Sequence, residues 1–590
     1  MPETEATELR RSLHEACNTL AFLNLHQAAK WCAEALNGLS PLPNGIIAQT
    51  STTKTTKPPT EDEVADEPMV MLARAYFNCR EFDRAAYILR GCRSGNGRFL
   101  RLYAMLIAVD KRATEETDGT LNVASNVSNN VTVANGGNSN SQSSHNSSSG
   151  TEENNDTVNV LNGVLSKILQ EADSYHQSPN NEPNAFLHYL CGVVYNRKRK
   201  QAFAQTHLCN SVVLFPYNWL CWQELVATLS TYDEAVTLMA KLRHHRSGVA
   251  NTVMFRFFEV VVWQEFDHQA KELSEKLDLL AVEFPNFTFV KVQQFLIAYH
   301  QLDYFRAEAL FDQILKADPL RLDDLDTYSN MLYVMEKRAK LAYLAQLAAH
   351  IDKFRPETCC VIANYHSIKG EHEKAIMYYK RALVLNKNCQ SAWTLMGHEF
   401  VELKNSHAAI ESYRRAVDSN ARDFRAWYGL GQAYEVLDMH LYALYYYQRA
   451  ATLQPTDKRM WHALGNCYDK IGKWHEAIGA FEKALSIDSA DQANGQVPEP
   501  HVCFKLATIW DKVGSALETY KYYQLCYAQE EVWGVTDETS KARLWLARNA
   551  LQEKRHEEAY ELTKDLNLSN AHDIEEARSI ARDARNRMLK

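Results

Sequence analysis

Hydrophobic and small residues recur every 34 residues along the C-terminal half of this 590-residue chain. Within each period the apolar positions are three and four residues apart, which is typical of one face of an α-helix. Six columns agree in three consecutive periods: Trp393, Trp427 and Trp461; Gly397, Gly431 and Gly465; Phe400, Tyr434 and Tyr468; Ala409, Ala443 and Ala477; Tyr413, Tyr447 and Phe481; Ala416, Ala450 and Ala484. Each period therefore predicts two amphipathic helices.

This period, with Trp, Leu, Gly and Tyr followed by Ala, an aromatic residue and Ala, is the tetratricopeptide signature. The small residues at positions eight and twenty of each repeat are expected where two antiparallel helices cross. A proline at position 32, seen as Pro455, ends the second helix. The sequence predicts an all-α superhelix, an α-solenoid of about a dozen helical hairpins.

The repeat continues outside these three periods. Upstream, further units are expected to start at these residues: Asp66, Ala185, Met254, Thr288 and Pro356. The units at Ala185, Met254 and Thr288 end on prolines in the expected place: Pro216, Pro285 and Pro319. Downstream, an insertion around DQANGQVPEP shifts the frame, and a last hairpin is expected over residues 540–566.

Composition changes divide the chain into segments. We expect an N-terminal helical segment (1–36), a flexible linker rich in Pro and Thr (37–65), an N-terminal repeat array (66–253), a C-terminal superhelix with a partner groove (254–566) and a charged C-terminal helix or tail (567–590). An Asn/Ser-rich insert at 118–156 has little to bury, so it is expected to be a disordered loop.

Charge and cysteine content argue against several classes of protein. The chain has 64 Lys plus Arg and 73 Asp plus Glu, a net charge of −9, which argues against nucleic-acid binding through the overall field. Its start lacks a basic region followed by an apolar core, and no window is apolar enough to span a membrane. The 13 cysteines include no C-x-x-C pair, which indicates free thiols in a reducing compartment. Adjacent Cys359 and Cys360 are expected to be a core thiol beside a groove thiol.

The sequence contains no complete catalytic motif of the common types. His372, His398 and His556 each precede a Glu, but none has the second His of a zinc-protease motif. There is no Walker loop or G-x-S-x-G elbow, and the G-x-G at Gly429 lies inside a helical repeat. We predict a protein that is not an enzyme and uses no cofactor and no metal.

A helical solenoid offers a concave groove lined by one face of each first helix. The second, fifth, ninth and twelfth or thirteenth positions are expected to line it. Position nine of successive repeats, called column nine below, holds Asn330, Asn364, His398, Gln432 and Asn466. Acidic residues of the same face are Asp323, Asp326, Glu357, Glu402, Glu435 and Asp469.

These residue types suit an extended peptide that contains arginine. Amides donate and accept at once, so they can hold a peptide backbone, and carboxylates pair with guanidinium groups. A solvated helix face is the alternative for any single carboxylate, since exposed charges are common. The pair Asn330 and Asn364, in consecutive repeats, stands out from that background.

Stretches between the repeat columns resemble the family of subunit 8 of the anaphase-promoting complex, or cyclosome, also called cell division cycle protein 23. They are AYFNCREFDRAAYIL (75–89), DTYSNMLYVMEKRAKLAYLA (326–345), RPETCCVIANYHS (355–367), AWTLMGHEFVELKN (392–405) and RAWYGLGQAYEVL (425–437). The similarity runs from about residue 8 to 555. The inserts near 118–156 and 491–499 and the C-terminal tail depart from it.

The resemblance implies a scaffold subunit of a ubiquitin ligase that drives mitotic progression and exit in nucleus and cytoplasm. It implies a homodimer formed through repeats at about 66–250, contacts with other subunits of the complex, and a groove that receives the arginine-containing C-box of a coactivator. Ubiquitin transfer would belong to cullin and RING subunits.

Two other classes of tetratricopeptide protein fit the sequence less well. A co-chaperone of the carboxylate-clamp type needs Lys and Arg at the groove positions, where this chain has acids. An enzyme with tetratricopeptide arms, such as a sugar transferase, needs a catalytic domain of a few hundred residues, and no such span remains.

Overall fold

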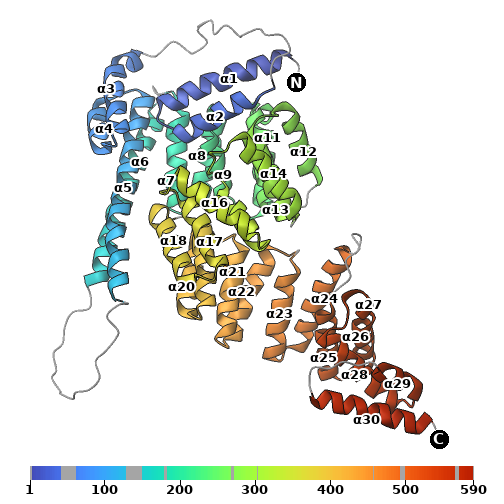
Figure 1. Ribbon diagram of the computed structural model, residues 1–590. Helices are drawn as coiled ribbons and strands as arrows, with labels where there is room; N and C mark the ends of the chain where they lie inside the picture. Colours follow the sequence, from blue (N-terminus) through green and yellow to red (C-terminus); the bar gives the residue numbers. More distant parts are fainter. Residues whose placement is uncertain are drawn as a thin grey trace, which may run out of the picture. The chain divides into compact units, whose positions relative to one another are not determined.

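The computed structural model describes residues 3–40, 61–127, 149–178, 182–246, 248–266, 271–301, 303–387, 389–455, 457–491, 499–564 and 571–588 (Figure 1). In these ranges the secondary structure is helical, with no strand. Consecutive helices pack as antiparallel hairpins. The chain forms two compact units, Met1–Arg321 and Leu322–Lys590, here called unit 1 and unit 2. The predicted all-α array of about a dozen hairpins is confirmed.

The helices of unit 1 are α1 (Glu3–Phe22), α2 (His26–Gly38), α3 (Glu61–Asn78), α4 (Phe82–Ile88), α5 (Gly95–Val127), α6 (Ser149–Gln177), α7 (Ala185–Arg197), α8 (Gln201–Leu214), α9 (Trp219–Ala227), α10 (Tyr232–Arg243), α11 (Val253–Phe266), α12 (Lys271–Glu283), α13 (Thr288–His300) and α14 (Tyr304–Ala317). Two short 3-10 helices also occur in this unit: Leu89–Gly91 lies between α4 and α5, and Val249–Asn251 lies between α10 and α11.

The helices of unit 2 are α15 (Leu325–Val334), α16 (Arg338–Ile351), α17 (Pro356–Ile368), α18 (His372–Leu385), α19 (Gln390–Glu402), α20 (Ser406–Ser419), α21 (Phe424–Val436), α22 (His440–Leu453), α23 (Lys458–Ile471), α24 (Trp474–Asp491), α25 (Pro500–Val513), α26 (Ala516–Ala528), α27 (Glu530–Trp533), α28 (Asp537–Gln552), α29 (His556–Lys564) and α30 (Ala571–Met588).

Helix boundaries follow the sequence pattern closely. Three repeat starts, at Ala185, Thr288 and Pro356, are the first residues of α7, α13 and α17. Second helices end two residues before each marker proline: α8 before Pro216, α12 before Pro285, α14 before Pro319 and α22 before Pro455. Proline lacks the N–H and disfavours a helical residue before it, so the helix stops there.

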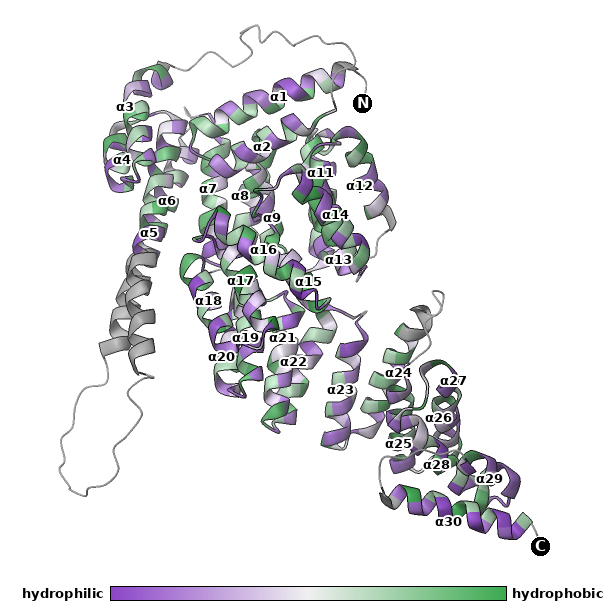
Figure 2. Cartoon of the chain, viewed as in Figure 1, coloured by the Kyte–Doolittle hydropathy of each residue, from purple (hydrophilic) through white to green (hydrophobic). Residues whose placement is uncertain are grey.

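The small-residue columns lie where the two helices of a hairpin cross. A Cβ added to Gly397 would lie 2.5 Å from Cε1 of Tyr413, and one added to Gly431 would lie 2.5 Å from Cδ1 of Tyr447. Both tyrosines are buried. Hydrophilic and hydrophobic residues mix along the helices, as a one-sided core requires (Figure 2).

The N-terminal segment is a hairpin, α1 with α2, that belongs to the core of unit 1. Trp31 of α2 stacks on Trp219 of α9 with ring centroids 4.8 Å apart, and it meets Phe257 and Phe287 edge-on. Gly38, the last residue of α2, approaches Phe287 so closely that a Cβ there would lie 2.5 Å from the Cβ of Phe287. Residues 3–40 are therefore part of the folded repeat array.

Several local expectations differ from the structure. Helix α3 begins at Glu61, inside the stretch expected to be a linker, and α5 and α6 extend into both ends of the Asn/Ser-rich insert. The expectations for residues 41–60 and 128–148 lie outside the described residues. One thiol of the pair Cys359 and Cys360 was expected in the groove, but both are buried, at 1% and 0% exposed. The assignment of dimerisation to 66–253 and of the partner groove to 254–566 stays a prediction.

Three histidines meet between α6, α7 and α8 of unit 1. The ring of His176 stacks on that of His188 with centroids 3.9 Å apart, and Nδ1 of His188 is 3.1 Å from Nδ1 of His207. Burial lowers the pKa of all three and brings that of His188 to about 4. The carboxylate of Asp173 partly offsets this effect, because it raises the pKa of His176 and His207. Tyr195 covers the ring of His207. The cluster is therefore neutral at physiological pH.

Acidification is expected to destabilise unit 1 through this cluster. The unfolded imidazole of His188 takes up a proton near pH 6.5, whereas the folded one resists until about pH 4, so stability falls as the pH drops between these values. From about pH 7.5 to about pH 5 the loss at His188 is about 2 kcal/mol. Urea unfolding of the full chain followed by circular dichroism measures it. His188→Gln should lose less stability on acidification than the exposed control His26→Gln. Equal losses would contradict the assignment.

Candidate peptide-binding face of the second unit

The residues of column nine occupy the same place on five successive first helices. Asn330 lies on α15, Asn364 on α17, His398 on α19, Gln432 on α21 and Asn466 on α23. Asn364 is 2% exposed, whereas the other four are partly exposed. The repeat thus brings all five to one column, but four of them, and not Asn364, reach the surface.

The pair Asn330 and Asn364 is hydrogen-bonded across consecutive hairpins. Nδ2 of Asn364 donates to Oδ1 of Asn330 at 2.6 Å and to Oγ of Ser329 at 2.7 Å. Oδ1 of Asn364 accepts from the hydroxyl of Tyr379, which is 1% exposed. The amide of Asn364 is therefore fully used inside the protein. Nδ2 of Asn330 makes no hydrogen bond to the described residues and remains available as a donor.

The middle of column nine is uncharged. Nδ1 of His398 is 2.8 Å from the hydroxyl of Tyr413, and burial lowers the pKa of His398 to about 4, so its imidazole is neutral near pH 7. Gln432 hydrogen-bonds to Tyr428, whose pKa is raised by burial. These side chains present polar atoms without a formal charge, as the flanking amides do.

Several of the predicted acids are paired with basic residues of the protein. Glu435 accepts from the hydroxyl of Tyr447 at 2.9 Å and lies 3.5 Å from Nζ of Lys470. Asp469 lies 2.6 Å from Nζ of Lys512. In both cases the lysine comes from a later first helix. Glu402, the last residue of α19, is exposed and makes no ion pair within the described part of the chain.

The acids nearest the start of unit 2 are also held internally. Arg355 pairs with Asp323 at 2.9 Å and with Glu357 at 3.4 Å. Asp326 accepts from Oγ of Ser391 at 3.1 Å, and burial raises its pKa. The predicted acidic groove is therefore largely neutralised, and Glu402 is the predicted acid that is best placed to receive an arginine.

One buried carboxylate was missed by the sequence reasoning. Glu399 is 5% exposed, accepts from Oγ of Ser367 at 2.6 Å and lies 2.8 Å from Nδ1 of His372. It links α17 and α18 to α19. The signal was present, because a carboxylate next to His398 at a mostly apolar position requires a partner. Of the chain's described residues, no group of His, Cys, Asp or Glu is arranged to hold a metal ion.

Comparisons with known proteins decide the family. The sequence profile described as anaphase promoting complex subunit 8 / Cdc23 matches residues 8–295, and tetratricopeptide repeat profiles match residues 356–389, 394–458 and 459–491. The anaphase-promoting complex subunit CDC23 of Saccharomyces cerevisiae is 39% identical over 98% of both chains. The chain belongs to the anaphase-promoting complex subunit 8 (Cdc23) family.

Other relatives agree with this assignment. Anaphase-promoting complex subunit 8 of Arabidopsis thaliana is 32% identical over 68% of this chain and 66% of its own length. The crystal structure of the APC/C hetero-tetramer Cut9-Hcn1 matches with a TM-score of 0.52 over 88% of both chains at 15% identity, which shows the shared fold. As a Cdc23-family protein, the chain is a non-catalytic tetratricopeptide subunit of the anaphase-promoting complex. In the described ranges, no helix combines the length and the apolar character needed to cross a membrane.

Proposed function

We propose that this Cdc23-family subunit holds an arginine-containing segment, the C-box of a coactivator, against column nine of unit 2. The observation that carries the proposal is the arrangement of neutral polar side chains on consecutive first helices. Such a column can pair with the amides of an extended peptide without requiring a particular side chain. A tetratricopeptide co-chaperone is the alternative, and it would select a C-terminal carboxylate instead of arginine.

Asn330, Asn364 and Glu402 have different roles in this proposal. Asn330 donates to a peptide carbonyl through its available Nδ2, and Asn364 fixes the orientation of Asn330. Glu402 receives a guanidinium group, because it is exposed and has no ion pair in the described part of the chain. His398, Gln432, Glu435, Asn466 and Asp469 extend the same face.

We also propose a homodimer through the first repeats of unit 1, within a complex that acts in the nucleus and cytoplasm. Helices α3 and α4 present apolar side chains to solvent: Met71 is 61% exposed, Leu72 47% and Tyr87 65%. Exposed apolar groups of this size are typical of a protein–protein contact. Other subunits of the complex are further candidates for the same surface.

Replacing Asn330 with alanine is expected to weaken binding of a C-box peptide about tenfold, since one donor to the peptide backbone is lost. Helix content should stay unchanged, and stability should fall by only about 1 kcal/mol, because Asn364 loses one acceptor but still donates to Ser329. Fluorescence anisotropy with the full chain and a labelled peptide measures the affinity.

The matched control is Gln552→Ala, an exposed amide at the end of α28 and outside column nine. A peptide with its arginines replaced by glutamine should bind weakly to every variant. Unchanged affinity of Asn330→Ala, or equal loss in both variants, would overturn the role given to column nine.

A further inference from the structure

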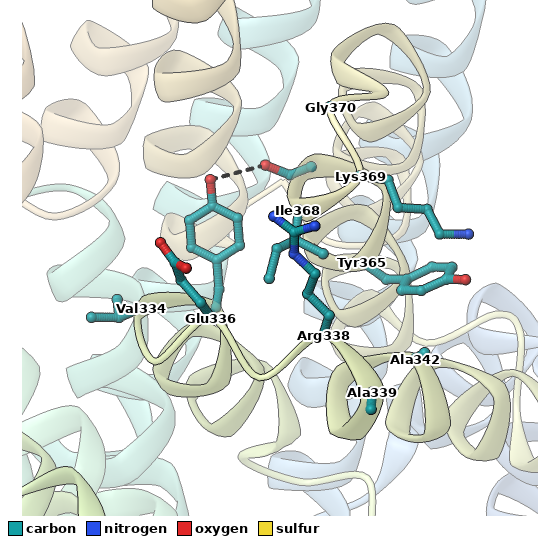
Figure 3. Close-up of a pocket in the computed structure, with 11 residues that line it drawn as sticks. Val334, Glu336, Arg338, Ala339, Ala342, Tyr365, Ile368, Lys369 and Gly370 are labelled. Carbon is teal, nitrogen blue, oxygen red and sulfur yellow. Dashed lines mark hydrogen bonds between the residues drawn. The ribbon is translucent and has the colours of Figure 1, made fainter.

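A cavity of about 950 Å³ lies one helical turn beyond column nine, between the first two hairpins of unit 2 (Figure 3). Tyr333 follows Asn330 by three positions and Ser367 follows Asn364 by three, so both lie on the helix face of column nine. The α15–α16 turn, α16 and the α17–α18 turn form the rest of the wall. A peptide held by column nine would therefore pass this cavity.

One wall of the cavity is a fixed phenol. The hydroxyl of Tyr333 lies 3.3 Å from Oγ of Ser367, which is 5% exposed and donates to buried Glu399 at 2.6 Å. This network sets the position of the phenol oxygen. Because the single proton of Ser367 goes to Glu399, the hydroxyl of Tyr333 donates its own proton to Oγ of Ser367. Tyr333 itself is 40% exposed.

The opposite wall carries positive charge. Arg338 is exposed, reaches toward the turn at Gly370, and its guanidinium makes no ion pair or hydrogen bond in the described part of the chain (Figure 3). Nζ of Lys369 lies 4.2 Å from the ring centroid of Tyr365, which holds it at the edge of the cavity. Glu336 is the carboxylate among the lining residues, so cations outnumber anions there.

A second carboxylate, that of Glu371, lies next to the lining residues in sequence but is already paired with residues of the protein. Glu371 follows the lining residue Gly370 and is held by Lys374 and His366 at 2.8 and 2.9 Å. Val334, Ile368, Ala339 and Ala342 supply apolar walls. The cavity thus combines apolar sides with a guanidinium, and with an ammonium at its edge, groups that match a carboxylate on a short apolar stem.

We propose that this cavity binds the side-chain carboxylate of an aspartate or glutamate in the peptide that lies along column nine, with Arg338 as the donor. The proposal rests on the proposed function and adds to it a required acidic residue at a fixed distance from the arginine. The cationic cavity and exposed Glu402 then lie on different hairpins, so together they set the direction in which the peptide runs.

A position scan tests this with the full chain. Labelled arginine-containing peptides carry one glutamate, moved along the sequence, and each has a glutamine twin; all are amidated so that no C-terminal carboxylate competes. At one position glutamate should bind about tenfold tighter than glutamine. Arg338→Gln should abolish that difference while leaving the affinity of the glutamine peptide unchanged. Tyr333→Phe should keep it, because the phenol proton is bonded to Ser367 and not offered to the cavity.

The matched control is Lys404→Gln, the same charge change on an exposed residue in the α19–α20 turn, away from the cavity. It should keep the glutamate preference. The cavity proposal is overturned if no position prefers glutamate, or if Arg338→Gln and Lys404→Gln behave alike while the glutamine peptides still bind. If no peptide binds at all, the proposed function fails and the cavity proposal fails with it.

Discussion

Replacing Gly431 with valine is expected to destabilise unit 2 by about 3 kcal/mol, because the new side chain overpacks the helix crossing. An added Cβ would lie 2.5 Å from Cδ1 of Tyr447. That ring cannot easily move, since it is 1% exposed, packs against Tyr428 and is anchored by its hydroxyl to Glu435 at 2.9 Å. Urea unfolding of the full chain, followed by circular dichroism, measures the loss.

The matched control is Gly479→Val on α24, where an added Cβ meets nothing within 4 Å. Valine and glycine have similar helix propensities, so this change should stay within about 0.5 kcal/mol. A second test shortens the opposing side chain: Tyr447→Leu should cost less in the Gly431→Val background than in the wild type, because the two changes relieve each other. Equal shifts for Gly431→Val and Gly479→Val would contradict the crossing role.

Much of the fold was predictable because the same residue types recur at the same positions of consecutive repeats, so each repeat checks the assignment made for the others. Gly397, Gly431 and Gly465 recur at one position, and each lies against the aromatic ring of its own hairpin. Prolines mark helix ends because they act on the residues next to them in sequence. The packing of Trp31 on Trp219 could not be predicted this way, since the contact joins residues far apart in sequence and leaves no periodic signal.

The candidate site was predictable as a column but not in its internal bonding. The 34-residue step correctly places the residues of column nine on successive first helices. It says nothing of neighbours, so it could not show that Tyr379 takes the amide oxygen of Asn364. The lysine partners were within reach: Lys470 follows Glu435 by 35 residues, and Lys512 follows Asp469 by 43, the same step lengthened by the insertion. Comparing positions twelve and thirteen of adjacent repeats would have found them.

Replacing Asn364 with alanine is expected to cost about 3 kcal/mol of unit 2 stability and also to weaken peptide binding. The change leaves the buried hydroxyl of Tyr379 without its acceptor and removes two donated bonds, to Ser329 and Asn330. Freed of that bond, the amide of Asn330 loses its fixed orientation and must be ordered by the peptide. Thermal unfolding and peptide anisotropy on the same protein measure the two effects.

A second substitution distinguishes a structural role of Asn364, which orients Asn330, from a direct contact of Asn364 with the peptide. In a Tyr379→Phe background the orphaned hydroxyl is absent, so Asn364→Ala should cost about 1 kcal/mol less than in the wild type. Asn466→Ala, the matched control in column nine with a partly exposed side chain, should change stability by less than about 0.5 kcal/mol. If Asn364→Ala instead leaves unfolding unchanged and abolishes binding, the amide of Asn364 contacts the peptide directly and the structural role proposed for it is wrong. Loss of stability with intact peptide affinity would show that orienting Asn330 does not matter for binding.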